Sequence, residues 1–71
     1  MNLQLTFSKN LIEAVKTSPL NYAELSKALG ITKATMSMYK HGKALPSLDT
    51  FNKICEILDV SADYLLGRKE F

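Results

Sequence analysis

The chain has 71 residues, a formal net charge of +2, 46% hydrophobic and 23% charged residues, and a single cysteine. This length and composition predict one small globular domain with a thin core. A homodimer contact would add to the stability of such a domain. The lone cysteine excludes an internal disulfide, no apolar run approaches the roughly 18 residues of a membrane span, and no basic segment precedes an apolar one at the N-terminus, so we expect a cytoplasmic protein without a membrane anchor.

The first predicted element is a short extended arm over residues 1–7. Polar and apolar residues alternate from residue 2 to residue 7, which is the period of a strand. Such an arm could pair across a dimer, and a frayed terminus is the alternative. Ser8 suits the cap of a first helix, which should end at Ser18-Pro19 because the residue before a proline is pushed out of helical geometry.

The second predicted helix starts at Asn21, with Glu24 three residues later in the capping-box arrangement. Its apolar stripe has the i, i+3, i+4 spacing of a helix and comprises Leu25, Ala28 and Leu29. Gly30 follows the last apolar residue, where a helix end favours the left-handed backbone that glycine adopts most easily. We therefore predict a tight turn at Gly30.

A third helix should follow this turn, capped by Thr32 and ending at His41. Its spacing points Met36 and Tyr39 inward. The positions free to point outward include Lys33, Thr35, Ser37 and Lys40. Two short helices joined by a glycine turn, the second with lysines and no acid, are typical of the helix-turn-helix of a DNA-binding protein.

The charges are unevenly distributed along the chain. No acid lies between Glu24 and Asp49, and the basic side chains of this window are Lys27, Lys33, Lys40, Lys43 and His41. A positive face on the helix-turn-helix would attract phosphate. An ordinary solvated surface is the alternative interpretation.

Two further helices are expected, capped by Ser47 and by Ser61. The first has an apolar stripe at helical spacing, predicted to lie in the core, that comprises Leu48, Phe51, Ile54, Cys55 and Leu58. Ile57 lies off this stripe and is expected to be exposed. Leu65 and Leu66 should close the bundle before Gly67.

From Asn21 to Gly67 the sequence resembles the lambda-repressor-like helix-turn-helix proteins, which include phage repressors, Cro proteins and their bacterial relatives. The matching positions are Gly30, Gly42-Lys43, Pro46-Ser47, Val60-Ser61 and Asp63-Tyr64-Leu65-Leu66-Gly67. The resemblance implies an all-α, compact five-helix DNA-binding domain with its helix-turn-helix at the second and third helices. We place this domain at residues 8–67, followed by a tail over residues 68–71.

The resemblance also implies a DNA-binding surface. In the family, DNA meets the first turn of the second helix, the cap of the third helix and the outer face of the third helix. The corresponding residues are Tyr22, Thr32, Lys33, Ala34, Thr35, Ser37 and Met38, with Lys40 and Lys43 near the phosphate backbone. Hydroxyls and helix N-terminal amides suit phosphate, and Lys33 suits a guanine edge or a phosphate.

Three of these positions depart from the family pattern. Tyr22 stands where the family usually has glutamine, and Ala34 and Met38 stand where it presents long polar side chains. Alanine and methionine can touch a thymine methyl group but make no bidentate base contact. Tyrosine and methionine are enriched in protein interfaces, so Tyr22, Ala34 and Met38 form an alternative surface for a cognate repressor protein. For Met38, a partly buried helix-edge position is a third interpretation.

Enzyme chemistry is not expected, because the one histidine and the one cysteine lie on different elements and no glycine-rich phosphate loop is present. We likewise expect no metal and no cofactor. The sequence predicts a Cro-like, phage- or prophage-encoded transcription regulator that binds double-stranded operator DNA in the cytoplasm of a bacterial host. The alternative is a bacteriophage antirepressor that binds the cognate repressor, and an antitoxin is a further possibility.

Overall fold

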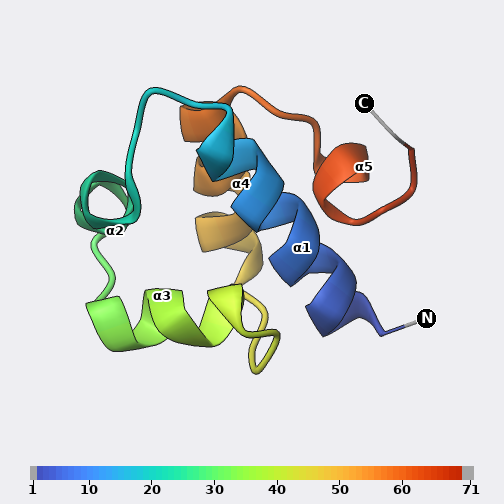
Figure 1. Ribbon diagram of the computed structural model, residues 1–71, viewed down its shortest axis with the longest axis horizontal. Helices are drawn as coiled ribbons and strands as arrows, with labels where there is room; N and C mark the ends of the chain where they lie inside the picture. The colour runs from blue at the N-terminus through green and yellow to red at the C-terminus, as the bar shows by residue number, and fades with distance from the viewer. Residues whose placement is uncertain (1, 70–71) are drawn as a thin grey trace.

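The computed structural model describes residues 2–69, which form five α-helices and no strand. The helices are α1 (Leu3–Lys16), α2 (Tyr22–Leu29), α3 (Lys33–Lys40), α4 (Leu48–Leu58) and α5 (Ala62–Leu65). Figure 1 shows α1 and α4 at the centre of the molecule, with α2 and α5 on opposite sides and α3 crossing below. This arrangement confirms the predicted all-α, five-helix fold.

The N-terminal segment is helical, so the predicted extended arm is wrong for residues 3–7, whereas Met1 lies outside the described residues. Asn2 caps α1, and its side-chain oxygen accepts a hydrogen bond from the Leu5 amide at 3.2 Å. Phe7 and Leu11 stand one helical turn apart and are both fully buried. This four-residue spacing continues the helical pattern across the predicted boundary, whereas an alternation over six residues is too short to distinguish the two periods.

Ser8 lies inside α1 and is not its cap. Its side chain is buried, and its hydroxyl donates a hydrogen bond to the carbonyl oxygen of Lys40, the last residue of α3. A serine buried in a helix needs such a partner because an unpaired hydroxyl in the interior is costly. The bond ties the end of α3 to α1. Helix α1 ends at Lys16, slightly before the predicted stop at Ser18-Pro19.

The other helix starts follow the predicted cap chemistry. Asn21 and Glu24 form both hydrogen bonds of a capping box. Thr32, Ser47 and Ser61 each accept a hydrogen bond from the amide three residues later. These caps satisfy amide groups that a helix start leaves without an intrahelical partner, so they fix where α2 to α5 begin.

A single core joins the helices, and α1 packs against both α3 and α5. The Phe7 ring lies edge-on to Tyr39, with centroids 6.2 Å apart, and 6.0 Å from the centroid of Phe51. The buried hydrophobic residues are Phe7, Leu11, Ala14, Val15, Leu25, Leu29, Met36, Tyr39, Ile54, Leu58 and Leu65. One aromatic side chain from α1 thus connects α3 with α4.

Three burial predictions need correction. Leu48 is 85% exposed, because it is the first residue of α4 and lies beyond the turns that pack on the core. Ala28 is exposed, and the buried stripe of α2 is formed with Ser26 in its place. Ile57 is partly buried and packs against the core, as does Cys55.

Candidate nucleic-acid interface

The turn between α2 and α3 is held by its backbone. Gly30 has φ 69° and ψ 31°, the left-handed conformation predicted from the sequence. The Gly30 amide donates to the Lys27 carbonyl at 3.2 Å, and the Ile31 amide donates to the Ser26 carbonyl at 3.0 Å. This pairing closes the end of α2 and sends the chain directly into α3.

The start of α3 presents polar groups to solvent. The Thr32 hydroxyl oxygen accepts from the Thr35 amide at 3.1 Å, and it donates to the Thr35 hydroxyl at 3.0 Å. The first turn of α3 contains no acid. Hydroxyl groups and the positive end of a helix suit a phosphate oxygen at this position.

The two sides of α3 differ in composition. Met36 and Tyr39 are buried, as predicted. Ala34 and Ser37 are exposed, and Met38 is 44% exposed, so its side chain is accessible to a partner while part of it is covered, as at the edge of a helix. The outer side of α3 therefore carries mainly uncharged side chains, two of which are short, and Lys33 lies at its N-terminal end.

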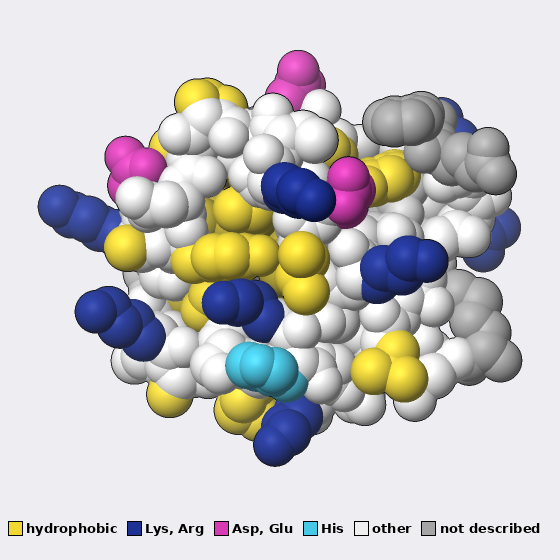
Figure 2. Space-filling view, in the orientation of Figure 1, with side chains coloured by type: hydrophobic (Ala, Val, Ile, Leu, Met, Phe, Trp, Pro, Cys, Tyr) yellow, Lys and Arg dark blue, Asp and Glu magenta, His cyan; other side chains and the backbone are white. Residues whose placement is uncertain are grey.

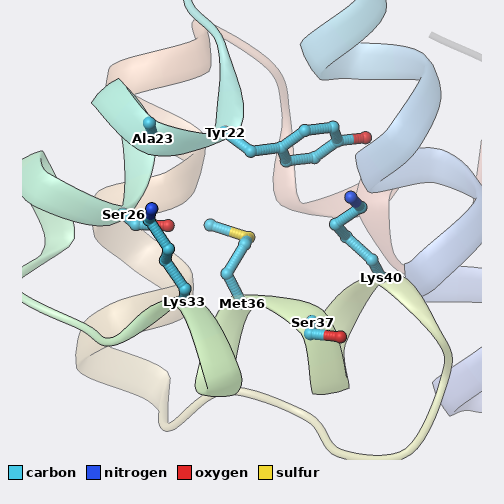
Figure 3. A pocket seen from close by; sticks show the side chains of 7 residues that line it. All are labelled: Tyr22, Ala23, Ser26, Lys33, Met36, Ser37 and Lys40. Carbon is cyan, nitrogen blue, oxygen red and sulfur yellow. The ribbon is translucent and has the colours of Figure 1, made fainter.

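A pocket of about 240 Å³ lies between α2 and α3. Figure 3 shows Met36 pointing into it, with Lys33 at one side and the Tyr22 ring and Lys40 at the other. The Lys40 ammonium nitrogen lies 4.0 Å from the centroid of the Tyr22 ring, which is a cation–π contact. Burial raises the pKa of the Tyr22 phenol, so this side chain is neutral at physiological pH.

The predicted site residues divide between two places. The pocket brings together Tyr22, Lys33, Ser37 and Lys40, whereas its lining does not include Ala34 or Met38. Lys43 lies in the loop after α3, where its amide donates to the Met38 carbonyl at 2.9 Å. The proposed protein-partner surface of Tyr22, Ala34 and Met38 is therefore not one continuous pocket.

The sequence interpretation missed part of the pocket wall. Ala23 and Ser26 line the pocket, although the sequence pattern predicts no site role for either, and so does Met36, which the pattern predicts only to point inward. The pairing of Tyr22 with Lys40 joins residues eighteen positions apart on different helices, so no short-range periodicity predicts it. Only the three-dimensional crossing of α2 and α3 reveals it.

The surface chemistry of this side fits an anionic partner. Figure 2 shows a hydrophobic patch at the left of this face with Lys and Arg side chains around it, and the acidic side chains lie in the upper half of the view. Within residues 2–69, no group of three or more metal-ligating side chains comes together. In the same part of the chain, no helix has the length and apolar character needed to cross a bilayer.

Cys55 is expected to react slowly with thiol reagents. Burial and the neighbouring Glu56 carboxylate raise the pKa of its thiol above the ordinary value, so little thiolate is present at neutral pH. Timed labelling with a chromogenic disulfide should show a slower reaction in the folded protein than in urea. Equal rates in the two conditions would contradict a shielded thiol.

Comparison with known proteins identifies a family of DNA-binding domains and several similar bacterial proteins. The family model described as "Cro/C1-type HTH DNA-binding domain" matches residues 10–70. Similar curated proteins of Bacillus subtilis (strain 168) include the uncharacterized HTH-type transcriptional regulator YqaE, 40% identical over 60 residues, which cover 84% of this chain and 52% of YqaE. The SPbeta prophage-derived uncharacterized HTH-type transcriptional regulator YonR is 35% identical over 60 residues, covering 84% of this chain and 56% of YonR.

The HTH-type transcriptional regulator ImmR of the same organism is 32% identical over 66 residues, which cover 93% of this chain and 52% of ImmR. The chain therefore spans about half the length of these curated relatives. No solved structure matches it.

Proposed function

Since this chain belongs to the Cro/C1-type helix-turn-helix DNA-binding family, we propose that it regulates transcription by binding double-stranded operator DNA through α2 and α3. The observation that carries this proposal is the geometry of the α2–α3 unit, with left-handed Gly30 at the turn and no acid between Glu24 and Asp49. A unit of this shape can place one helix in the major groove and leave the other against the backbone.

The contacts follow from where the side chains lie. The hydroxyls of Thr32 and Thr35, and the amides at the start of α3, suit phosphate oxygens. Lys33 and Ser37 suit base edges, and the exposed Ala34 and Met38 suit thymine methyl groups. Lys40 and Lys43 add positive charge at the other end of α3. Few of these side chains can make a bidentate base contact, so phosphate contacts should supply most of the affinity.

The antirepressor alternative is not favoured, because the curated relatives are named as transcriptional regulators. One of these names states a prophage origin, which supports a phage or prophage setting for this chain as well. Action in the cytoplasm of a bacterial host, and binding as a homodimer, belong to the same proposal. The exposed apolar side chains of Leu45 and Leu48 support a contact with another copy.

Binding to DNA is expected to weaken steeply with salt. A few phosphate contacts per subunit predict a slope of roughly −3 to −6 when the logarithm of the binding constant is plotted against that of the salt concentration. Lys33→Ala and Lys43→Ala should each make the slope shallower by about 1. Titrations of labelled DNA from the region beside the protein's own gene, at several salt concentrations, measure both effects.

Lys9→Ala is the matched control for these lysines. Lys9 is an exposed lysine on α1, and it lines a depression formed with the end of α5, away from the α2–α3 unit. Its replacement removes the same charge and should leave the slope nearly unchanged. If Lys9→Ala changes the slope as much as Lys33→Ala, the α2–α3 unit is not the contact surface.

A further inference from the structure

Tyr22 and Lys40 both line the α2–α3 pocket, and they form a cation–π contact with each other. Their contact is close, because the ammonium nitrogen lies 4.0 Å from the ring centroid and attraction extends to roughly 6 Å. Both side chains are partly buried, which strengthens a cation–π contact relative to one in open water. The contact therefore restricts where the Lys40 ammonium group can lie.

Lys40 is fixed at both ends. Its carbonyl oxygen accepts the hydrogen bond from the buried Ser8 hydroxyl, so its backbone is tied to α1. Its ammonium group is held over a ring whose own position is set by the capping box at the start of α2. A free lysine side chain has many rotamers to lose when it binds a ligand, and a side chain held in advance loses fewer.

The held ammonium group can still bind an anion. An ammonium group has three N–H donors, and the ring occupies only one side of it. Lys40 lines the pocket, with Lys33 at its opposite side (Figure 3). A phosphate group that approaches the pocket would meet a charge already in position.

We propose that Tyr22 is a positioning residue that holds Lys40 ready for a phosphate of the DNA backbone, an inference that rests on the proposed function. Tyr22 acts here through its aromatic face and not through its hydroxyl. Lys40 should therefore contribute more affinity than Lys43, which is exposed in the loop after α3. The site is sequence-independent, because a phosphate is the same at every base pair.

The test lowers the negative charge on the face of the ring at position 22 and leaves the shape of the ring nearly unchanged. Tyr22→Phe removes the hydroxyl and keeps the ring face, and phenylalanines with increasing ring fluorination at position 22 weaken that face stepwise. The probe is a labelled DNA duplex of random sequence, which reports phosphate contacts independently of any operator. Taking Tyr22→Phe as the reference of the series, we expect affinity to fall with each added fluorine, and the most fluorinated ring to bind about two- to fivefold more weakly than Tyr22→Phe.

The dependence on fluorination should disappear when Lys40→Met is introduced, because the ring then has no cation to hold. Lys43→Met is the matched control, since it removes a neighbouring lysine and should leave the dependence in place. A role of Tyr22 in folding alone would give neither result. The proposal would be overturned if the affinity for the duplex did not change with ring fluorination, or if fluorination lowered the affinity equally with and without Lys40→Met. Either result would leave DNA binding itself intact.

A second measurement needs no DNA. The ε-methylene protons of Lys40 lie near the ring, so their proton NMR signals should be shifted upfield in the wild type and in Tyr22→Phe, and not in Tyr22→Leu. Unshifted signals in the wild type would contradict the contact itself. If the shift is present and the duplex is not bound even at low salt, the proposed function fails instead.

Discussion

Phe7→Ala is expected to lower the free energy of unfolding by about 3–5 kcal/mol, the usual cost of removing a buried aromatic side chain. The Phe7 side chain is fully buried and contacts the rings of Tyr39 and Phe51. A 71-residue chain has a total stability of only about 4–10 kcal/mol by the usual value per residue, so the loss should leave the variant close to unfolding. Urea unfolding followed by circular dichroism measures the change.

Two further variants define this result. Phe7→Leu keeps most of the apolar volume and should lose less stability than Phe7→Ala, which remains measurable if the alanine variant does not fold. Leu5→Ala is the control on the same helix. Because Leu5 is 56% exposed, this substitution should lower the free energy of unfolding much less than Phe7→Ala does. If Phe7→Ala unfolds at the same urea concentration as Leu5→Ala, Phe7 does not form part of the core.

Gly30→Val is expected to destabilise the protein by about 2 kcal/mol. A left-handed backbone costs an L-residue roughly 1–2 kcal/mol, and a β-branched side chain raises that cost. Beyond Gly30 and its neighbours in the chain, no atom lies within 4 Å of the position that a Cβ at Gly30 would occupy, so that Cβ meets neither a clash nor new packing. The backbone conformation alone should therefore determine the effect, which thermal unfolding measures as a lower Tm.

Gly30→Asn is the matched substitution, since asparagine tolerates the left-handed region better than other residues with a Cβ. Its loss of stability should be clearly smaller than that of Gly30→Val. Equal losses for the two variants would show that side-chain size, and not backbone conformation, governs this turn.

Local chemistry explains why much of this fold could be predicted. The Asn21–Glu24 capping box, the turn at Gly30 and the caps at Ser47 and Ser61 each depend on residues within five positions of one another. Such signals are complete within a short segment of sequence. The sequence does not predict the start of α1, because Phe7 is buried against residues of α3 and α4 that lie far away along the chain.

The candidate site was predictable to a lesser degree. The residue types on α3 followed from the resemblance to a family, and helical spacing separated the buried Met36 and Tyr39 from the exposed positions. The contact of Tyr22 with Lys40 depends on how two helices cross, and the sequence carries no local signal for a crossing. The exposure of Leu48 has the same origin, because periodicity cannot show where neighbouring elements stop covering a helix.

The packing of α1 also has a consequence for how the chain folds as it is synthesised. Phe7 finds its partners at Tyr39 and Phe51, and Ser8 finds its partner at Lys40, all more than thirty residues downstream. At about 5–20 residues added per second, these partners follow α1 by a few seconds, whereas small helical domains fold within about milliseconds. The nascent α1 must therefore keep an uncovered apolar stripe throughout that interval, available to the ribosome surface and to chaperones, until the later helices emerge.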